Sequence, residues 1–118
     1  MADELVHREA ASPNWDERAL PVTMVVLHYT EVASTQASLA RLTDPEAKVS
    51  PHYLISEEGE VIRLVEEAKR AWHAGASYWR GLRDVNSASI GIGLQHPGHG
   101  VGYPGFAGGH VGAAPPVL

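Results

Sequence analysis

Three histidines lie in sequence settings where an imidazole could do chemistry. His28 ends the apolar run VTMVVLHY, His52 opens HYLIS, and His73 lies in AWHAG. A neutral imidazole at the end of a rigid strand can bind zinc, but a buried histidine can equally be satisfied by one hydrogen bond. From position alone both interpretations of His28 stay open.

Aromatic residues accompany two of these histidines. Tyr53 follows His52, and because side chains alternate along a strand, we expect one of the pair to be packed and the other to face a cleft. Trp72 and His73, with Trp79 nearby, suit either an aromatic cluster that holds down a loop or a subsite for a sugar or peptide.

Composition excludes several other chemistries. A length of 118 residues fits one domain. The absence of cysteine excludes a disulfide scaffold, a thiolate nucleophile and any Cys-based metal site. The net charge of -5 argues against a nucleic-acid partner, which would require clustered Lys and Arg. The sequence also has no GxSxG motif and no phosphate-binding loop.

The elements that must position the histidines alternate along the chain. The apolar run 22–29 predicts a strand buried on both faces, and 89–95 (SIGIGLQ) predicts a second buried strand. Between them we expect a helix that Ser34 or Thr35 caps and Pro45 ends. A hairpin over 52–56 and 61–65 with Gly59 in its turn should follow, and then a loop with a helical turn over 71–81. The pattern predicts an α/β fold, with a mixed central sheet flanked by helices.

Charge is distributed unevenly along the chain. Every Asp, Glu, Lys and Arg lies at or before Asp84. We therefore expect an irregular Gly/Pro-rich tail over 104–118, a domain over 20–103 and an N-terminal extension over 1–19. The first residues have no apolar signal segment, and no run suits a membrane span, so we expect a cytoplasmic monomer.

Three segments, taken together, carry a resemblance to a known family. VVLHYT, VSPHYLISEEGEVIRLVEEAKRAWHAGASYWRG and LRDVNSASIGIGLQHPGHGVGY occur in order within about residues 20–103. They closely resemble the zinc-dependent N-acetylmuramoyl-L-alanine amidases of type 2, which are similar in fold to peptidoglycan recognition proteins. The combination of HYLI, a later glycine, AWHAG and WRG makes the resemblance specific.

The resemblance implies roles for several residues. His28 would be the first zinc ligand, with Tyr53, Trp72 and His73 along the substrate cleft. Arg83 and Asn86 could bind the peptide or sugar, although an ordinary solvated loop explains them as well. The family places two more ligands in a later HxD-type segment, whereas this chain has no Asp after Asp84 and so resembles a C-terminally truncated member.

A second departure from the family concerns the catalytic glutamate. The family has this residue, which acts on the attacking water, in the strand that SIGIGLQ matches, and Gly93 stands at its position. The three later histidines could complete a metal site or belong to a polar loop. They are His96, His99 and His110.

The resemblance implies hydrolysis of the amide between N-acetylmuramic acid and L-alanine in peptidoglycan or muropeptides. Two alternatives stay open. One is a module that binds muropeptides without catalysis, and the other is an inactive truncated fragment.

Overall fold

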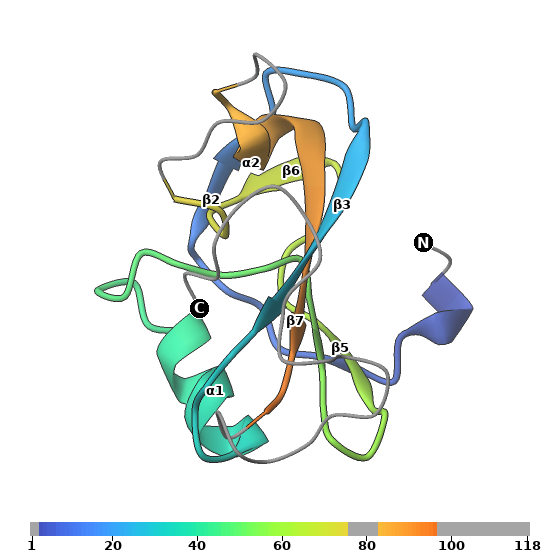
Figure 1. Ribbon diagram of the computed structural model, residues 1–118, viewed down its shortest axis with the longest axis vertical. Helices are drawn as coiled ribbons and strands as arrows, with labels where there is room; N and C mark the ends of the chain where they lie inside the picture. Colours follow the sequence, from blue (N-terminus) through green and yellow to red (C-terminus); the bar gives the residue numbers. More distant parts are fainter. Residues whose placement is uncertain (1–2, 76–82, 97–118) are drawn as a thin grey trace.

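A five-stranded mixed sheet organises the protein. The computed structural model describes residues 3–75 and 83–96. The strands of the main sheet follow the order β1-β5-β4-β7-β3, and β2 pairs with β6 in a second, two-stranded sheet (Figure 1). The strands are β1 (Arg8–Glu9), β2 (Trp15–Glu17), β3 (Met24–Tyr29), β4 (Tyr53–Ile55), β5 (Val61–Arg63), β6 (Lys69–Ala71) and β7 (Ser89–Leu94). The helices are the 3₁₀ turn η1 (Asp3–Leu5), α1 (Thr35–Leu42) and α2 (Val85–Ala88). A mixed sheet with helices confirms the predicted fold class.

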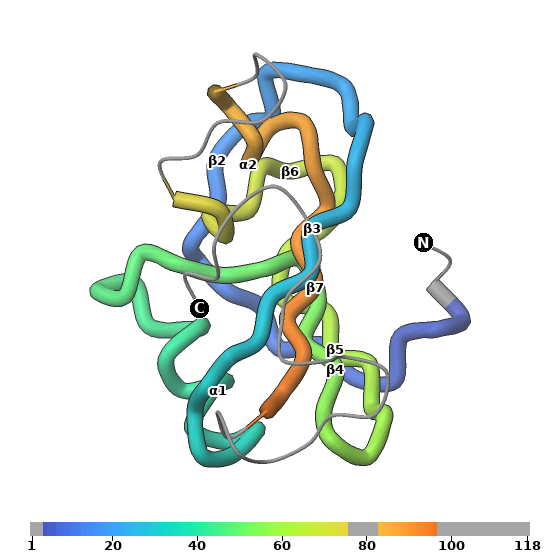
Figure 2. Tube along the Cα trace, viewed as in Figure 1, coloured from blue at the N-terminus to red at the C-terminus, as the bar shows by residue number. Residues whose placement is uncertain are grey.

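Two neighbouring parallel strands, β3 and β7, carry the residues of interest. They pair from Met24 opposite Ser89 to Tyr29 opposite Leu94 and lie side by side in both views (Figures 1 and 2). All six residues of β7 are buried, as predicted for this run. β3 lies at the edge of the described sheet, and Val25 is 55% exposed. The prediction that this strand is buried on both faces is therefore wrong, because Val26 and His28 are buried on one face whereas Val25 is exposed on the other.

The hairpin predicted after the helix is confirmed. β4 pairs antiparallel with β5 and parallel with β7, so it joins the hairpin to the central strands. Gly59 in the turn has φ of +89°, a conformation that costs glycine little. Its N–H donates to Ser56 O at 2.9 Å, which closes the turn.

Helix α1 begins where the sequence predicts. Ser34 is its N-cap, and the Ser34 side chain accepts a hydrogen bond from the N–H of Ala37 at 3.1 Å. Leu42 is buried, and Leu39 packs beside it against Leu54 and Ile62 of the hairpin. The apolar side of α1 therefore covers the β4–β5 part of the sheet.

The sequence analysis expects the domain to begin at residue 20, but residues before this point also form strands of the two sheets. β1 pairs parallel with β5, and β2 pairs antiparallel with β6. Asn14 is buried between them, and its Nδ2 donates to the carbonyls of Leu42 at 3.2 Å, Asp44 at 3.0 Å and Val49 at 3.0 Å. Because Leu42 ends α1, Asn14 satisfies a carbonyl that the helix end leaves without an intrahelical partner.

The segment over 71–81, predicted as a loop with a helical turn, falls partly outside the described residues. Its first residue, Ala71, ends β6. The short helix α2 follows at Val85–Ala88, with Asp84 as the N-cap whose carboxylate accepts from the N–H of Ser87 at 3.2 Å. Across the described ranges, no helix is long and apolar enough to cross a membrane.

Candidate functional site

A chain of hydrogen bonds links His28 to the protein interior. His28 lies in β3, and its side chain is fully buried. Its Nε2 is 2.9 Å from Nδ1 of His73, and Nε2 of His73 is 2.9 Å from Oγ of Ser89. Ser89 Oγ in turn donates to the carbonyl of Val85 at 2.6 Å. The two rings meet edge to face, with centroids 5.2 Å apart.

The fully buried ring of His73 is the middle member of this chain. It packs on the backbone of β7, where a Cβ added to Gly91 would lie 2.4 Å from His73 Cγ. Burial first, and then the neighbouring His28 and His52, lower the pKa of His73 from 6.5 to about 2. His73 is therefore neutral at pH 7.

A third buried histidine, His52, lies next to His73, and the centroids of the two rings are 6.0 Å apart. Its Nδ1 accepts from the N–H of Gly91 at 3.0 Å, and its Nε2 lies 2.8 Å from the carbonyl of Lys69 and 3.0 Å from Nη2 of Arg18. Because the N–H of Gly91 can only donate, Nδ1 of His52 has the lone pair, and the neutral ring is protonated on Nε2, which donates to Lys69. Burial lowers its pKa to about 4. Both His52 and Tyr53 are packed, whereas the sequence predicted that one of them faces a cleft.

Arg18 is a charged residue that the sequence analysis did not identify. Its Nη2 donates to the carbonyls of Glu67 and Lys69, both at 2.6 Å, and its Nη1 donates to the carbonyls of Ser87 and, at 3.0 Å, Ser89. The guanidinium thus ties β6 to α2 and to the start of β7. Its Nη2 also lies 3.0 Å from Nε2 of His52. Nothing in the sequence before residue 20 distinguishes this arginine from a surface one, because its partners are main-chain carbonyls and a histidine from distant segments of the chain.

Tyr53 is buried in β4, and its hydroxyl donates to Glu67 Oε2 at 2.5 Å. Burial first, and then the hydrogen bond to Glu67, raise the pKa of Tyr53 to about 12. The phenol is therefore protonated at neutral pH and acts as a hydrogen-bond donor.

The remaining predicted substrate-binding residues lie around the end of β6 and the start of α2. Trp72 is half-buried, and Arg83 is exposed. Asn86 is buried, and its Oδ1 accepts from the N–H of His73 at 3.0 Å and from that of Ala74 at 2.8 Å. Asn86 therefore fixes the backbone that carries His73.

The described residues provide one candidate metal ligand of the expected kind, His28. Within 3–75 and 83–96, no three His, Asp or Glu side chains gather as a metal site. His96 is buried, with its ring 5.4 Å from that of Tyr29. The predicted residues Trp79, His99 and His110 lie outside the described ranges.

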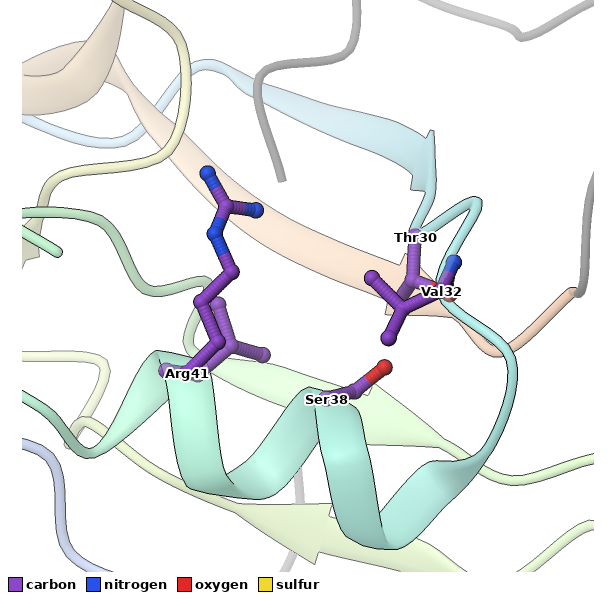
Figure 3. Close-up of a pocket in the computed structure, with 5 residues that line it drawn as sticks. Thr30, Val32, Ser38 and Arg41 are labelled. Carbon is purple, nitrogen blue, oxygen red and sulfur yellow. Dashed lines mark hydrogen bonds between the residues drawn. The ribbon is translucent and has the colours of Figure 1, made fainter.

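A small groove lies elsewhere, between α1 and the segment that follows β3. Its lining residues are Thr30, Val32, Ser38, Arg41 and Leu42 (Figure 3). Ser38 Oγ and Thr30 Oγ1 both donate to Gln95 Oε1, at 2.5 and 3.2 Å, so these hydroxyls are used within the protein. The groove contains none of the predicted site residues.

Comparison with known proteins places this arrangement among the peptidoglycan amidases. A family model described as N-acetylmuramoyl-L-alanine amidase matches residues 18–112. The match spans most of the chain, and the chain belongs to this family. The resemblance seen in the sequence is thereby confirmed.

Two curated relatives illustrate the similarity and its extent. The N-acetylmuramoyl-L-alanine amidase AmiD of Escherichia coli is 40% identical over 84 residues, which are 65% of this chain and 29% of AmiD. The 1,6-anhydro-N-acetylmuramyl-L-alanine amidase AmpD of Haemophilus influenzae is 29% identical over 107 residues, which are 75% of this chain and 58% of AmpD. The chain therefore spans less than two thirds of either relative.

Solved structures agree on the fold. A crystal structure of an AmpD derivative matches with a TM-score of 0.63 at 31% identity, covering 81% of this chain and 66% of that one. AmiD from E. coli, in complex with the substrate anhydro-N-acetylmuramic acid-L-Ala-D-gamma-Glu-L-Lys, matches with a TM-score of 0.57 at 36% identity. That match covers 88% of this chain and 38% of AmiD.

Proposed function

We propose that this domain acts on muropeptides and hydrolyses the amide between N-acetylmuramic acid and L-alanine. The observation that carries the proposal is the family match over residues 18–112, which includes the strand that ends near His28. The muropeptide bound to the similar AmiD supports this class of ligand.

His28 is the residue that we propose as a zinc ligand. Its donor chemistry fits, since a neutral imidazole is a common zinc ligand and its Nε2 is already engaged by His73. A catalytic zinc ion uses three protein ligands and, when bound, supplies hydroxide near neutral pH and polarises the carbonyl. The described residues contribute one of these three ligands, so we derive no step of the reaction through the metal.

We propose that the substrate contacts involve Tyr53 and Trp72, as the resemblance implies, together with Arg83 and Asn86, whose side chains suit a peptide or sugar. His73, predicted along the same cleft, is fully buried. Arg83 is an exposed residue, and the guanidinium of an arginine suits a carboxylate of the stem peptide. The half-buried ring of Trp72 suits apolar contact with the sugar or the lactyl group. Tyr53 and Asn86 are buried and would act by shaping the wall behind these contacts.

Binding without hydrolysis is the second candidate function. It is favoured by Gly93, which stands where the resemblance places a glutamate and has no side chain to act on water. A chain of this kind would hold the muropeptide and leave its amide intact. The cytoplasmic location and the monomeric state expected from the sequence stay predictions.

One experiment separates the two functions. The purified chain is incubated with a muropeptide that contains N-acetylmuramoyl-L-alanine, with and without Zn²⁺, and the products are analysed by mass spectrometry. Hydrolysis adds one water across the amide and releases a peptide with a free L-alanine amine.

Calorimetric titration with the same muropeptide gives the matched binding measurement. Binding with an intact amide supports the second candidate. If the natively folded chain neither binds nor cleaves the muropeptide, both functions are excluded for it. The variant His28→Gln is the control, which should abolish any zinc-dependent cleavage.

A further inference from the structure

The hydroxyl of Ser89 determines where the protons of the histidine chain lie. Ser89 Oγ is 2.6 Å from the carbonyl of Val85, and a carbonyl has no hydrogen to donate. The single hydroxyl hydrogen therefore lies between these two oxygens. Ser89 Oγ can then only accept in its second contact, the one at 2.9 Å from Nε2 of His73.

The proton assignment continues to His28. His73 carries its proton on Nε2, because that nitrogen must donate to Ser89. A neutral His73 then has a lone pair on Nδ1, and this atom accepts from Nε2 of His28 at 2.9 Å. His28 is accordingly protonated on Nε2, and its remaining lone pair is on Nδ1.

We propose that His73 and Ser89 are positioning residues that hold His28 as the Nε2–H tautomer and so leave Nδ1 as its ligand-binding atom. The ligand-binding role of Nδ1 rests on the proposed function, whereas the assignment of the protons rests on the hydrogen bonds alone. A metal-binding histidine is commonly oriented by the group that accepts from its other nitrogen. Here that acceptor is a second imidazole rather than a carboxylate or a backbone carbonyl.

The surroundings make this arrangement rigid. Asn86 accepts hydrogen bonds from the backbone N–H groups of His73 and Ala74, which fixes the segment that carries the ring. Gly91 allows the ring to approach the sheet, since a Cβ there would overlap His73 Cγ. Because His28 and His73 are both fully buried, water does not compete for their hydrogen bond.

The test reads the tautomers directly. Long-range ¹H–¹⁵N correlation spectra of the full chain show which nitrogen of each imidazole carries the proton. We expect His28 to be protonated on Nε2 and unprotonated on Nδ1 in the unmodified protein. A His28 ring protonated on Nδ1 would overturn the proposal, and this measurement needs no variant.

Two variants at His73 test its role. His73→Leu removes the acceptor and should give a mixture of both His28 tautomers. His73→Asn keeps an acceptor oxygen near the position of Nδ1 and should restore the Nε2–H form. A natively folded His73→Leu protein that retains only the Nε2–H form would refute the positioning role.

The variant Ser89→Ala is a smaller change and covers the case in which His73→Leu does not fold. It removes the oxygen that accepts from Nε2 of His73, so His73 should populate both tautomers. His28 should then populate both tautomers as well. Unchanged tautomers in this variant would contradict the role of Ser89. The internal control is His52, whose Nε2–H form is set by backbone groups and should not change.

Titration with Zn²⁺ alone distinguishes this proposal from the proposed function. If the unmodified chain binds zinc, loss of the acceptor in His73→Leu should weaken binding about 10- to 100-fold. If it binds none while the tautomer is as expected, the metal-binding part of the proposed function fails and the positioning of His28 stands. Equal zinc affinity in both proteins would contradict the positioning role.

Discussion

The ring of His73 lies directly against the backbone of Gly91, in the middle of β7. A Cβ at Gly91 would be 2.4 Å from Cγ of His73 and 2.6 Å from its Cδ2 and Nδ1, far closer than van der Waals contact allows. Glycine at this position is therefore a requirement of the histidine chain rather than of the strand. The alternation of small and apolar residues in SIGIGL has a physical reason here.

The substitution Gly91→Ala should displace the ring of His73. We expect a loss of about 1–3 kcal/mol in the free energy of unfolding, as for other overpacked cores. We also expect loss of the single Nε2–H tautomer of His28, because its acceptor moves. Urea denaturation and the imidazole spectra measure the two effects.

Gly59→Ala is the matched control for this variant. Gly59 has a positive φ but nothing within 4 Å of an added Cβ. Its replacement should cost about 1 kcal/mol from backbone strain alone and leave the imidazole spectra unchanged. If Gly91→Ala proves no more destabilising than Gly59→Ala and retains the His28 tautomer, the packing argument is incorrect.

Removal of the guanidinium of Arg18 should destabilise the fold. Arg18→Met removes the guanidinium donor that the carbonyls of Glu67 and Lys69 each have at 2.6 Å, and Lys69 then has only its contact with Nε2 of His52. We expect a loss of about 3 kcal/mol in the free energy of unfolding, measured by urea denaturation. Arg18→Lys keeps the charge but cannot reach carbonyls on both sides of the guanidinium, so it should recover only part of the loss. Full recovery in Arg18→Lys would show that charge alone matters.

The stability of the protein should fall as the pH decreases from about 6.5 to about 4. In the folded state burial keeps His52 neutral, with a pKa of about 4, whereas the unfolded chain has the ordinary value of 6.5. Between these values the unfolded state binds more protons, and acid therefore favours unfolding. For His52 alone the free energy of unfolding should be about 3 kcal/mol lower at pH 4 than at pH 7.

The variant His52→Asn isolates this contribution. The Asn oxygen can accept from the N–H of Gly91 as Nδ1 of His52 does, but the side chain does not titrate. Urea denaturation of both proteins at several pH values should show a smaller dependence on pH in the variant. Identical dependence in the two proteins would mean that His52 is not the titrating group.

The sequence was sufficient to predict the elements with strong local signals. The apolar runs that became β3 and β7, the Ser34 cap of α1 and the hairpin around Gly59 all depend on neighbouring residues. Strands β1, β2 and β6 have two or three residues each, and they form through pairing with segments far away in the chain. Local patterns cannot reveal such pairs.

The candidate site was predicted only in part, because its contacts also join segments that lie far apart in the chain. His28, His52 and His73 were identified by type and setting, yet their grouping depends on the parallel pairing of β3 with β7 and on the return of the chain at α2. Ser89 and Arg18 were missed, because a serine at a strand start and an arginine among charged residues carry no signal of their own. Their roles come from main-chain carbonyls that only the fold brings near.

A carboxylate at position 93 should restore catalysis if the proposed hydrolysis is correct. Gly93 is the register partner of His28, and residues 91 and 93 face the same side of the sheet, the side on which His73 packs against Gly91. A glutamate in Gly93→Glu would therefore project on the face of His28, where the resemblance places a group that acts on water. We expect faster zinc-dependent release of the peptide from a muropeptide than with the unmodified chain.

Gly93→Gln is the control for this change, because it adds nearly the same volume without the carboxylate. It should bind the muropeptide like Gly93→Glu and show no gain in hydrolysis, with circular dichroism used to establish that both variants fold. Mass spectrometry of the products gives the rate for each protein. A gain in both variants would show that the added volume, and not the carboxylate, is responsible. If both variants fold and neither hydrolyses the muropeptide faster, the absent carboxylate at position 93 is not what limits hydrolysis. That result would favour the binding function.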